Sequence, residues 1–262
     1  MSANGAPREL WQALCEAGLG EDLLPLVCVL TVPIRPTSTL KELGKVPSDI
    51  DENGYARGLR GWPAKIATSH EIGRWSDDDR LGICLQTRIC KVFDVDIEDQ
   101  ELADRVEQFL RPRIAVLVGI EADQIPLRFR NNSSKFALIV RCEAVMPKRT
   151  IYLGGVNKIE FLGNGQQAVI SGTHPSGSRI LWEVMPTEAP RLTSGQIDGL
   201  WRELDEEFAV RPQSSSLELA SDPGDFMNGR GPKLGYTIEQ MRDLLNQLEP
   251  DMPRELWIRA MC

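Results

Sequence analysis

The sequence feature that most constrains the fold is the stretch from Lys91 to Glu101, which reads KVFDVDIEDQE. Its apolar start is typical of a buried strand, which we predict over residues 88 to 94, yet it leads directly into Asp94 and Asp96. Residues two apart share one face of a strand, so the two carboxylates project together. Two like charges held close together are costly unless a cation lies between them. Oxygen ligands of this kind favour Mg²⁺ or Mn²⁺, so the pattern predicts a metal site.

The alternative is that the two acids only cap the helix that follows. Residues 102, 106, 109 and 110 are apolar at helical spacing, so a helix is expected there. Asp99 lies closer to its start and suits the N-cap position, which frees Asp94 and Asp96 for another role.

A third carboxylate and a histidine follow in the second half of the chain. Glu160 lies in a predicted strand, NKIEFL, and alternates with Ile159 and Phe161, so it faces away from those apolar side chains. His174 lies in a turn of small and polar residues, SGTHPSG. Glu160 is a candidate third metal ligand, with an ordinary surface glutamate as the alternative, and His174 is close enough in sequence to reach the same site. His70 fits a helix start better.

Charge and composition limit the other functions. The net charge of −8 argues against a non-specific nucleic-acid coat protein. Residues 128 to 149 nevertheless contain six basic residues and one acidic residue, which predicts either a local basic groove or a solvated strand surface. Six cysteines without a CxxC pair, and only two histidines, argue against a structural zinc site and favour reduced cytosolic thiols. No run of about 18 apolar residues and no secretory signal is present, so we expect a cytoplasmic protein without a membrane span.

The pattern of elements indicates an α/β or α+β chain with three parts. Helices are expected near residues 8–18, 69–75, 100–110 and 195–209, and strands at IPLRFR, FALIVRC, NKIEFL, QAVIS and RILWE. We predict a catalytic domain over residues 1–210 and a linker over 211–233. Residues 234–262 are interpreted as the start of a helical module that is cut short.

Several motifs in this order resemble a known family. They are GKVP, GLRGW, GRW, GICLQTRICKVFDVDIED, RFRNNSSKFALIVR, KIEFLGNGQQAVISGTHPSG and LWE. Together they resemble the primase–polymerase (prim-pol) catalytic domain of the archaeo-eukaryotic primase superfamily, in the form found in phages and mobile elements. The resemblance covers roughly residues 25–185, and the tail resembles the start of the primase C-terminal helical module.

The resemblance implies a fold and an activity. The fold would be a mixed sheet related to the RNA-recognition motif, with an N-terminal α/β unit. The activity would be that of a DNA primase and DNA polymerase, which joins an NTP or dNTP to a 3′-hydroxyl on a single-stranded DNA template by a two-metal mechanism. A helicase domain or protein often accompanies such domains. The metals would be Mg²⁺ or Mn²⁺.

The resemblance also assigns residues. Its acidic motifs fall on Asp94, Asp96 and Glu160, as catalytic residues and metal ligands. Its second motif normally contains a histidine, and RNNSSKFALIVR has none. We therefore expect the nucleotide to be bound by Lys135, Arg130, Ser133 and His174. The remaining basic residues of the same region are expected to bind nucleic acid: Arg128, Arg141, Lys148 and Arg149.

Three other classes of function remain open. A metal-dependent nuclease would use similar carboxylates. A nucleotide-sugar transferase with a DxD motif would leave the GQQ and HP motifs unexplained. A catalytically inactive nucleic-acid-binding module would account for the missing histidine.

Overall fold

The computed structural model describes residues 5–210 of the 262-residue chain. The helices are α1 (Arg8–Glu16), α2 (Ser69–Ser76), α3 (Gln100–Val118) and α4 (Ser194–Phe208), with short 3-10 turns at Gly20–Asp22, Trp62–Ala64, Ala122–Gln124 and Pro186–Glu188. The strands are β1 (Leu23–Val27), β2 (Ser48–Ile50), β3 (Ala56–Gly58), β4 (Leu81–Gln86), β5 (Cys90–Asp96), β6 (Leu127–Arg130), β7 (Ser133–Arg141), β8 (Arg149–Tyr152), β9 (Lys158–Leu162), β10 (Gln167–Ser171) and β11 (Leu181–Trp182).

The chain divides into two units, Met1–Arg211 and Pro212–Cys262. The predicted linker over residues 211–233 and the predicted helical module over 234–262 lie outside the described residues. The fold and the site described below belong to the first unit.

Six strands of this unit form one sheet in the order β11-β6-β7-β5-β9-β8. Every pair of neighbouring strands in it is antiparallel. The described chain is therefore α+β, but the prediction of a mixed sheet is wrong. The parallel strands β5 and β6 are not neighbours, because the hairpin between β6 and β7 inserts β7 between them.

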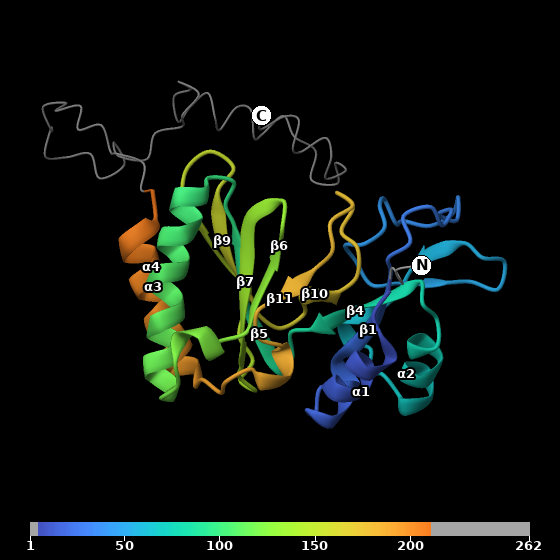
Figure 1. Cartoon of the computed structure of the whole chain (residues 1–262), viewed down its shortest axis with the longest axis horizontal. Coiled ribbons are helices and arrows are strands. Elements are labelled where there is room, and N and C mark those ends of the chain that lie inside the picture. The colour runs from blue at the N-terminus through green and yellow to red at the C-terminus, as the bar shows by residue number, and fades with distance from the viewer. Residues whose placement is uncertain (1–4, 211–262) are drawn as a thin grey trace, which may run out of the picture. The chain divides into compact units, whose positions relative to one another are not determined.

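Helices α3 and α4 cover one face of the six-stranded sheet (Figure 1). The apolar core between them contains Phe93 and Val95 of β5, Phe161 of β9, and Leu110 and Leu200 of the two helices. All five side chains are buried. The odd-numbered side chains of β5, Phe93 and Val95, therefore point toward the helices. Its even-numbered side chains point to the other face of the sheet.

The opposite face of the sheet is only partly covered. The three-stranded sheet β1-β4-β10 packs there with α1 and α2, in a second core that includes Val92 of β5 and Leu162 of β9. Val92 is fully buried, but Asp94 and Asp96 on the same face are only half-buried. Strand β5 therefore runs from beneath the second sheet into a more open region, and its two acids lie where the cover ends.

Most predicted elements are present, and the exceptions are instructive. Asp99 caps α3 as predicted, since its carboxylate accepts a hydrogen bond of 2.8 Å from the Leu102 N–H. The QAVIS segment forms β10 but joins β4, in the second sheet. Five strands, β1, β2, β3, β4 and β8, are not among the predicted strands. Among the described residues, no helix is both long and apolar enough to cross a membrane.

Candidate functional site

Three carboxylates meet on the open face of the six-stranded sheet. In the pairing of β5 with β9, Asp94 lies directly opposite Glu160, and Asp96 lies opposite Lys158. Directly opposite residues have Cβ atoms about 5 Å apart and share a face. The strand register therefore brings the predicted residues Asp94, Asp96 and Glu160 together, although 66 positions separate the first from the last in the sequence.

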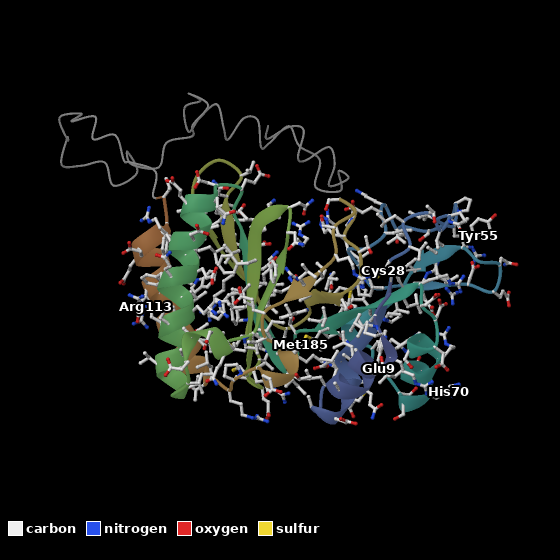
Figure 2. The ribbon with its side chains drawn as sticks, in the orientation of Figure 1. Glu9, Cys28, Tyr55, His70, Arg113 and Met185 are labelled. Carbon is white, nitrogen blue, oxygen red and sulfur yellow. The ribbon has the colours of Figure 1, made fainter. Side chains whose placement is uncertain are left out.

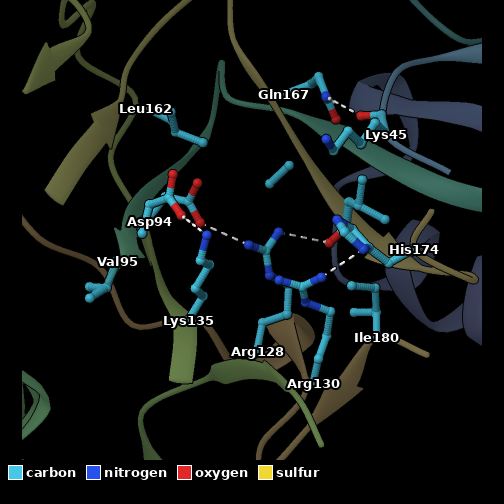
Figure 3. Close-up of a pocket in the computed structure, with 13 residues that line it drawn as sticks. Lys45, Asp94, Val95, Arg128, Arg130, Lys135, Leu162, Gln167, His174 and Ile180 are labelled. Carbon is cyan, nitrogen blue, oxygen red and sulfur yellow. Dashed lines mark hydrogen bonds and ion pairs between the residues drawn. The ribbon is translucent and has the colours of Figure 1, made fainter. Parts of the chain in front are cut away.

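Each of the two aspartates of β5 is paired with a basic side chain (Figure 3). A guanidinium nitrogen of Arg128 lies 2.8 Å from Asp94 Oδ1, and Lys135 Nζ lies 2.7 Å from Asp96 Oδ1. Arg128 also donates to the Val169 carbonyl of β10 at 3.1 Å, so it bridges the two sheets beside Asp94. Lys135, which was predicted to bind the nucleotide, and Arg128, which was predicted to bind nucleic acid, thus both lie beside the carboxylates.

Glu160 is held by two lysines. Its Oε1 lies 2.7 Å from Lys148 Nζ, and its Oε2 lies 3.1 Å from Lys158 Nζ. The Lys158 amine also lies 3.9 Å from Asp96 Oδ2, so it stands between two of the acids. The three carboxylates thus form a cluster in which basic side chains separate the negative charges.

The pKa values of the two opposing acids shift in opposite directions. Burial raises the pKa of Asp94, and the charges of Asp96 and Glu160 raise it further, against the opposing effect of Arg128. Burial also acts to raise the pKa of Glu160, but the hydrogen bonds and charges of Lys148 and Lys158 outweigh it and lower the pKa overall. The positive charge of Arg128 therefore does not fully offset the cost of burying the ionised carboxylate of Asp94.

A hollow of about 340 Å³ adjoins Asp94 and Asp96, between the six-stranded sheet and β10 (Figure 3). Four basic side chains line it against these two acids: Lys45, Arg128, Arg130 and Lys135. Gln167 of β10 and His174 complete its polar wall. A hollow with this balance of charge attracts anionic ligands while presenting carboxylates to them.

His174 is a neutral hydrogen-bonding group at the wall of this hollow. Its Nδ1 lies 2.6 Å from a guanidinium nitrogen of Arg130 and 3.2 Å from the Ser176 N–H. Both partners are donors, so Nδ1 accepts and the proton of the neutral ring lies on Nε2. Burial, together with the nearby charge of Arg130, lowers the pKa of His174 to about 4. Nε2–H is thus a donor that stays uncharged at neutral pH.

A second hollow, of about 600 Å³, continues from the first one and shares Arg130, Lys135 and His174 with it. It is also lined by the turn between β6 and β7 and by the start of β7, from Asn131 through Ser134. The Ser133 hydroxyl accepts hydrogen bonds from an Arg130 guanidinium nitrogen and from the Lys135 N–H, each at 3.2 Å. The four residues predicted to bind a nucleotide, Lys135, Arg130, Ser133 and His174, thus all line the second hollow, and three of them line the first as well.

Two of the predicted nucleic-acid-binding residues lie elsewhere. Arg141 is at the far end of β7, where its guanidinium donates to the Ala17 carbonyl at 2.8 Å. Arg149 lies on the helix side of the sheet, 2.6 Å from Asp198 of α4. The structure therefore gathers Arg128 and Lys148 with the carboxylates and leaves Arg141 and Arg149 apart from them.

Three residues of the site were given no role by the sequence. Lys158 touches two carboxylates, Lys45 lines the first hollow, and Gln167 donates a hydrogen bond of 2.8 Å to the Lys45 carbonyl. Lys45 and Gln167 lie in the quoted motifs GKVP and GNGQQ, which were the available signal. Lys158 lies two positions before Glu160 in the predicted strand NKIEFL. Strand alternation therefore places it on the same face as Glu160, and this was the available signal.

The donor set suits a divalent metal, but it is not assembled as a closed metal site. Carboxylate oxygens from adjacent strands are the ligands that Mg²⁺ and Mn²⁺ prefer. Within residues 5–210, however, no group of three or more His, Cys, Asp or Glu side chains is arranged to hold a metal ion. The two oxygens of Asp96 instead lie 2.7 Å from Lys135 Nζ and 3.9 Å from Lys158 Nζ.

No family model matches the chain, and comparisons with curated proteins and with solved structures also give no match. The resemblance to the prim-pol domains therefore stays a prediction, and the geometry of the site carries the functional argument.

The opposite pKa shifts of Asp94 and Glu160 lead to a prediction about stability. A carboxyl group whose pKa is raised on folding destabilises the protein when it is ionised, whereas one whose pKa is lowered stabilises it. We expect Asp94→Asn to raise the midpoint of thermal unfolding at pH 7, because Asn still accepts a hydrogen bond from Arg128. We expect Glu160→Gln to lower the midpoint by about 2–4 °C, the shift that a loss of about 1 kcal/mol gives in a chain of this size.

Both differences should shrink as the pH falls from 7 toward 3, because the wild-type carboxyls become protonated in both the folded and the unfolded states. Thermal unfolding followed by circular dichroism at several pH values measures this. Shifts in the same direction for the two variants would contradict the described electrostatics.

Proposed function

We propose that this protein is a DNA primase and DNA polymerase of the prim-pol type, which transfers nucleotides to a 3′-hydroxyl under the direction of a template. One observation carries the proposal. Three carboxylates from neighbouring strands, Asp94, Asp96 and Glu160, share one face of a sheet beside a hollow lined by four basic side chains. The acids suit metal ions, and the basic wall suits a triphosphate.

The topology of the main sheet supports the proposed relation to the RNA-recognition motif. Strand β5 lies between β7 and β9, β6 lies beyond β7, and helix α3 connects β5 to β6. This is a split β-α-β arrangement on a four-stranded antiparallel core, as in RNA-recognition motifs. The carboxylates lie on the face that the helices leave uncovered. The archaeo-eukaryotic primase fold is our proposal on this basis.

In the proposed reaction the 3′-hydroxyl oxygen bonds to the α-phosphorus of an NTP or dNTP. The bond from that phosphorus to the bridging oxygen breaks, and pyrophosphate leaves. Arg130 and Lys135 would neutralise the triphosphate, because Arg can fork onto two phosphate oxygens and Lys acts as a point charge. The neutral Nε2–H of His174 would donate to a phosphate or sugar oxygen without changing its charge between pH 6 and 8.

Asp94, Asp96 and Glu160 would hold Mg²⁺ or Mn²⁺ once the lysine amines have moved from their oxygens. Such ions, when bound, stabilise the negative charge that develops on the attacking and leaving oxygens. The ion pairs of Lys135 and Lys158 with Asp96 would offset the repulsion between the neighbouring carboxylates before a metal ion binds. Because these ion pairs would have to open first, we expect the three carboxylates to bind metal ions tightly only when nucleotide binds as well.

The same ion pairs favour one alternative, a catalytically inactive nucleic-acid-binding module. In that case the lysines would neutralise the acids permanently, and no Mn²⁺ site that depends on the carboxylates would exist. A metal-dependent nuclease is a further alternative, and it would cut DNA in Mg²⁺ without responding to nucleotides. The two adjoining hollows, with their shared basic wall, favour nucleotide binding over both.

The proposal is tested by synthesis of primers on single-stranded DNA with labelled nucleotides, with and without Mn²⁺. Labelled products that require metal, template and Asp94 support it. Cleavage of the template without product argues for the nuclease, and the absence of either activity argues for the inactive module. The proposed setting is replication of a phage or mobile element in the cytoplasm of a bacterium or infected host, with a helicase domain or protein as a further partner.

Lys135 gives a prediction for the nucleotide itself. We expect Lys135→Ala to raise the KM for nucleotide at least tenfold, which corresponds to about 1.4 kcal/mol, because one cation of the phosphate wall is lost. The affinity for single-stranded DNA should change much less. Steady-state extension kinetics and a gel shift measure the two quantities. If the variant loses DNA binding and keeps its KM, Lys135 belongs to the template groove instead.

A further inference from the structure

A third hollow, outside the carboxylate site, lies beside the hairpin of β2 and β3. It encloses about 500 Å³ and is lined by Arg35, Arg57 and Arg60, by the hydroxyl-bearing Thr37 and Thr39, and by Ser38, Gly58 and Leu59. No acidic side chain is among the lining residues. Figure 2 labels Tyr55, the residue that precedes β3 in this hairpin.

Carboxylates neutralise little of the positive charge of the arginines that line this hollow. Within residues 5–210, Arg57 and Arg60 have no ion pair with a carboxylate. Arg35 has a single long contact of 3.4 Å with Asp51, whose side chain is almost fully buried. Three guanidinium groups around one space repel each other unless an anion joins them. This excess of positive charge stands out in a chain with a net charge of −8.

The fold holds the walls of the hollow in place. The Ser38 hydroxyl accepts hydrogen bonds from the Leu40 N–H at 3.1 Å and from the Gly58 N–H at 3.3 Å. The Arg35 N–H donates to the Ala56 carbonyl at 2.9 Å. The loop that carries Arg35 and the two threonines is thereby tied to strand β3, which carries Arg57.

We infer that this hollow binds phosphate groups of a single-stranded nucleic acid. Guanidinium forks match phosphate oxygens, and hydroxyl groups commonly supply further donors to a nucleic-acid backbone. The site lacks the carboxylates that a metal would need, and it lacks a deep apolar wall that would enclose a base. It is therefore suited to the backbone of a strand and not to the reacting nucleotide.

The position of the hollow favours a strand over a free phosphate compound. Thr39 lines this hollow and Lys45 lines the carboxylate hollow, and these two residues are six Cα-to-Cα steps apart in one loop. Such a segment spans at most about 21 Å. A strand of a few nucleotides could therefore contact both hollows, which a single small anion could not. The inference rests on the proposed function for the identity of the strand and adds a second contact site for it, whose binding does not require catalysis by the carboxylates.

The test measures binding of the full chain to a fluorescent single-stranded oligonucleotide by anisotropy at several salt concentrations. We expect the double variant Arg57→Ala, Arg60→Ala to weaken binding at least tenfold. The slope of log K against log salt should become less steep by about 1.4, the value for two lost phosphate contacts on a single strand. The matched control is Arg8→Ala, Arg113→Ala, which removes two exposed arginines elsewhere, one of them on the outer side of α3 (Figure 2). The control should bind like the wild type.

A second variant leaves all the arginines in place. Gly58 lines the hollow, and a Cβ added there would meet no atom within 4 Å, so Gly58→Glu introduces a carboxylate without a clash. It should weaken binding as the double variant does, whereas Gly58→Ala should not. The binding is measured without nucleotide or metal ion, so a failure of this inference and a failure of the proposed catalysis are told apart.

Three results would overturn the inference. The first is oligonucleotide binding by the double variant that equals binding by its arginine control. The second is loss of binding to a free nucleoside triphosphate with no loss for the oligonucleotide, which would assign the hollow to small phosphate compounds. The third is displacement of the oligonucleotide by a polyglutamate peptide of equal charge at equal concentration, which would assign the hollow to acidic proteins.

Discussion

Asp94→Asn and Asp96→Asn should each abolish template-directed synthesis, with a loss of about three orders of magnitude or more. The proposed metal ions need charged oxygen ligands, and an amide has lost the charge while keeping the shape. Because metals and ligands act as a unit, either change alone should be nearly as damaging as both together. Rates of primer extension at saturating nucleotide measure the effect.

The matched control for these variants is Asp99→Asn. Asp99 lies only three residues beyond Asp96, and its carboxylate caps α3. Asn is an equally good N-cap, so the control makes the same change of charge near the site without loss of the cap. It should keep wild-type extension rates. Wild-type synthesis by either Asp94→Asn or Asp96→Asn would remove both residues from the proposed mechanism.

Glu160→Gln should lower the extension rate by several orders of magnitude, as the aspartate variants do. The reason is geometric, since Glu160 faces Asp94 across the β5 and β9 pair and is the only acid that β9 contributes to this face. Its alternative role is to hold Lys148 and Lys158 in place. Single-turnover extension with pre-bound primer separates this chemical step from product release.

Two controls separate the roles of Glu160. Glu98→Gln changes an exposed acid that makes only a 3.5 Å contact with Lys135, and it should have little effect. Lys148→Ala frees one oxygen of Glu160 without removing the carboxylate. If Lys148→Ala is as damaging as Glu160→Gln, the glutamate acts by positioning lysines. A small loss in Glu160→Gln would make it an ordinary surface residue.

The local parts of this site could be predicted from the sequence. Alternation along a strand is a local property, so the common face of Asp94 and Asp96 follows from two positions in the chain. The cap at Asp99 is local in the same sense, because donor and acceptor lie three residues apart. Both features were predicted, and both are present.

The remaining features depend on contacts between distant segments. The residue pattern of QAVIS predicts a strand but not its partner. In the structure β10 pairs with β4 in the second sheet, and this pairing places β10 at one wall of the first hollow. Arg128 and Arg141 look alike in a basic stretch, but one reaches Asp94 and the other reaches the Ala17 carbonyl. Register and packing decide these outcomes. The third hollow likewise combines a loop with the hairpin of β2 and β3, two strands that were not predicted from the sequence.

The most direct measurement of the central claim is extension of one labelled primer on four templates that differ only in the first unpaired base. Each reaction contains one nucleotide at a time with Mn²⁺, and the Asp94→Asn variant runs beside the wild type. Our account predicts that the wild type adds the nucleotide complementary to each template base and that the variant adds none. Addition that ignores the template base, or equal addition by the variant, would contradict it.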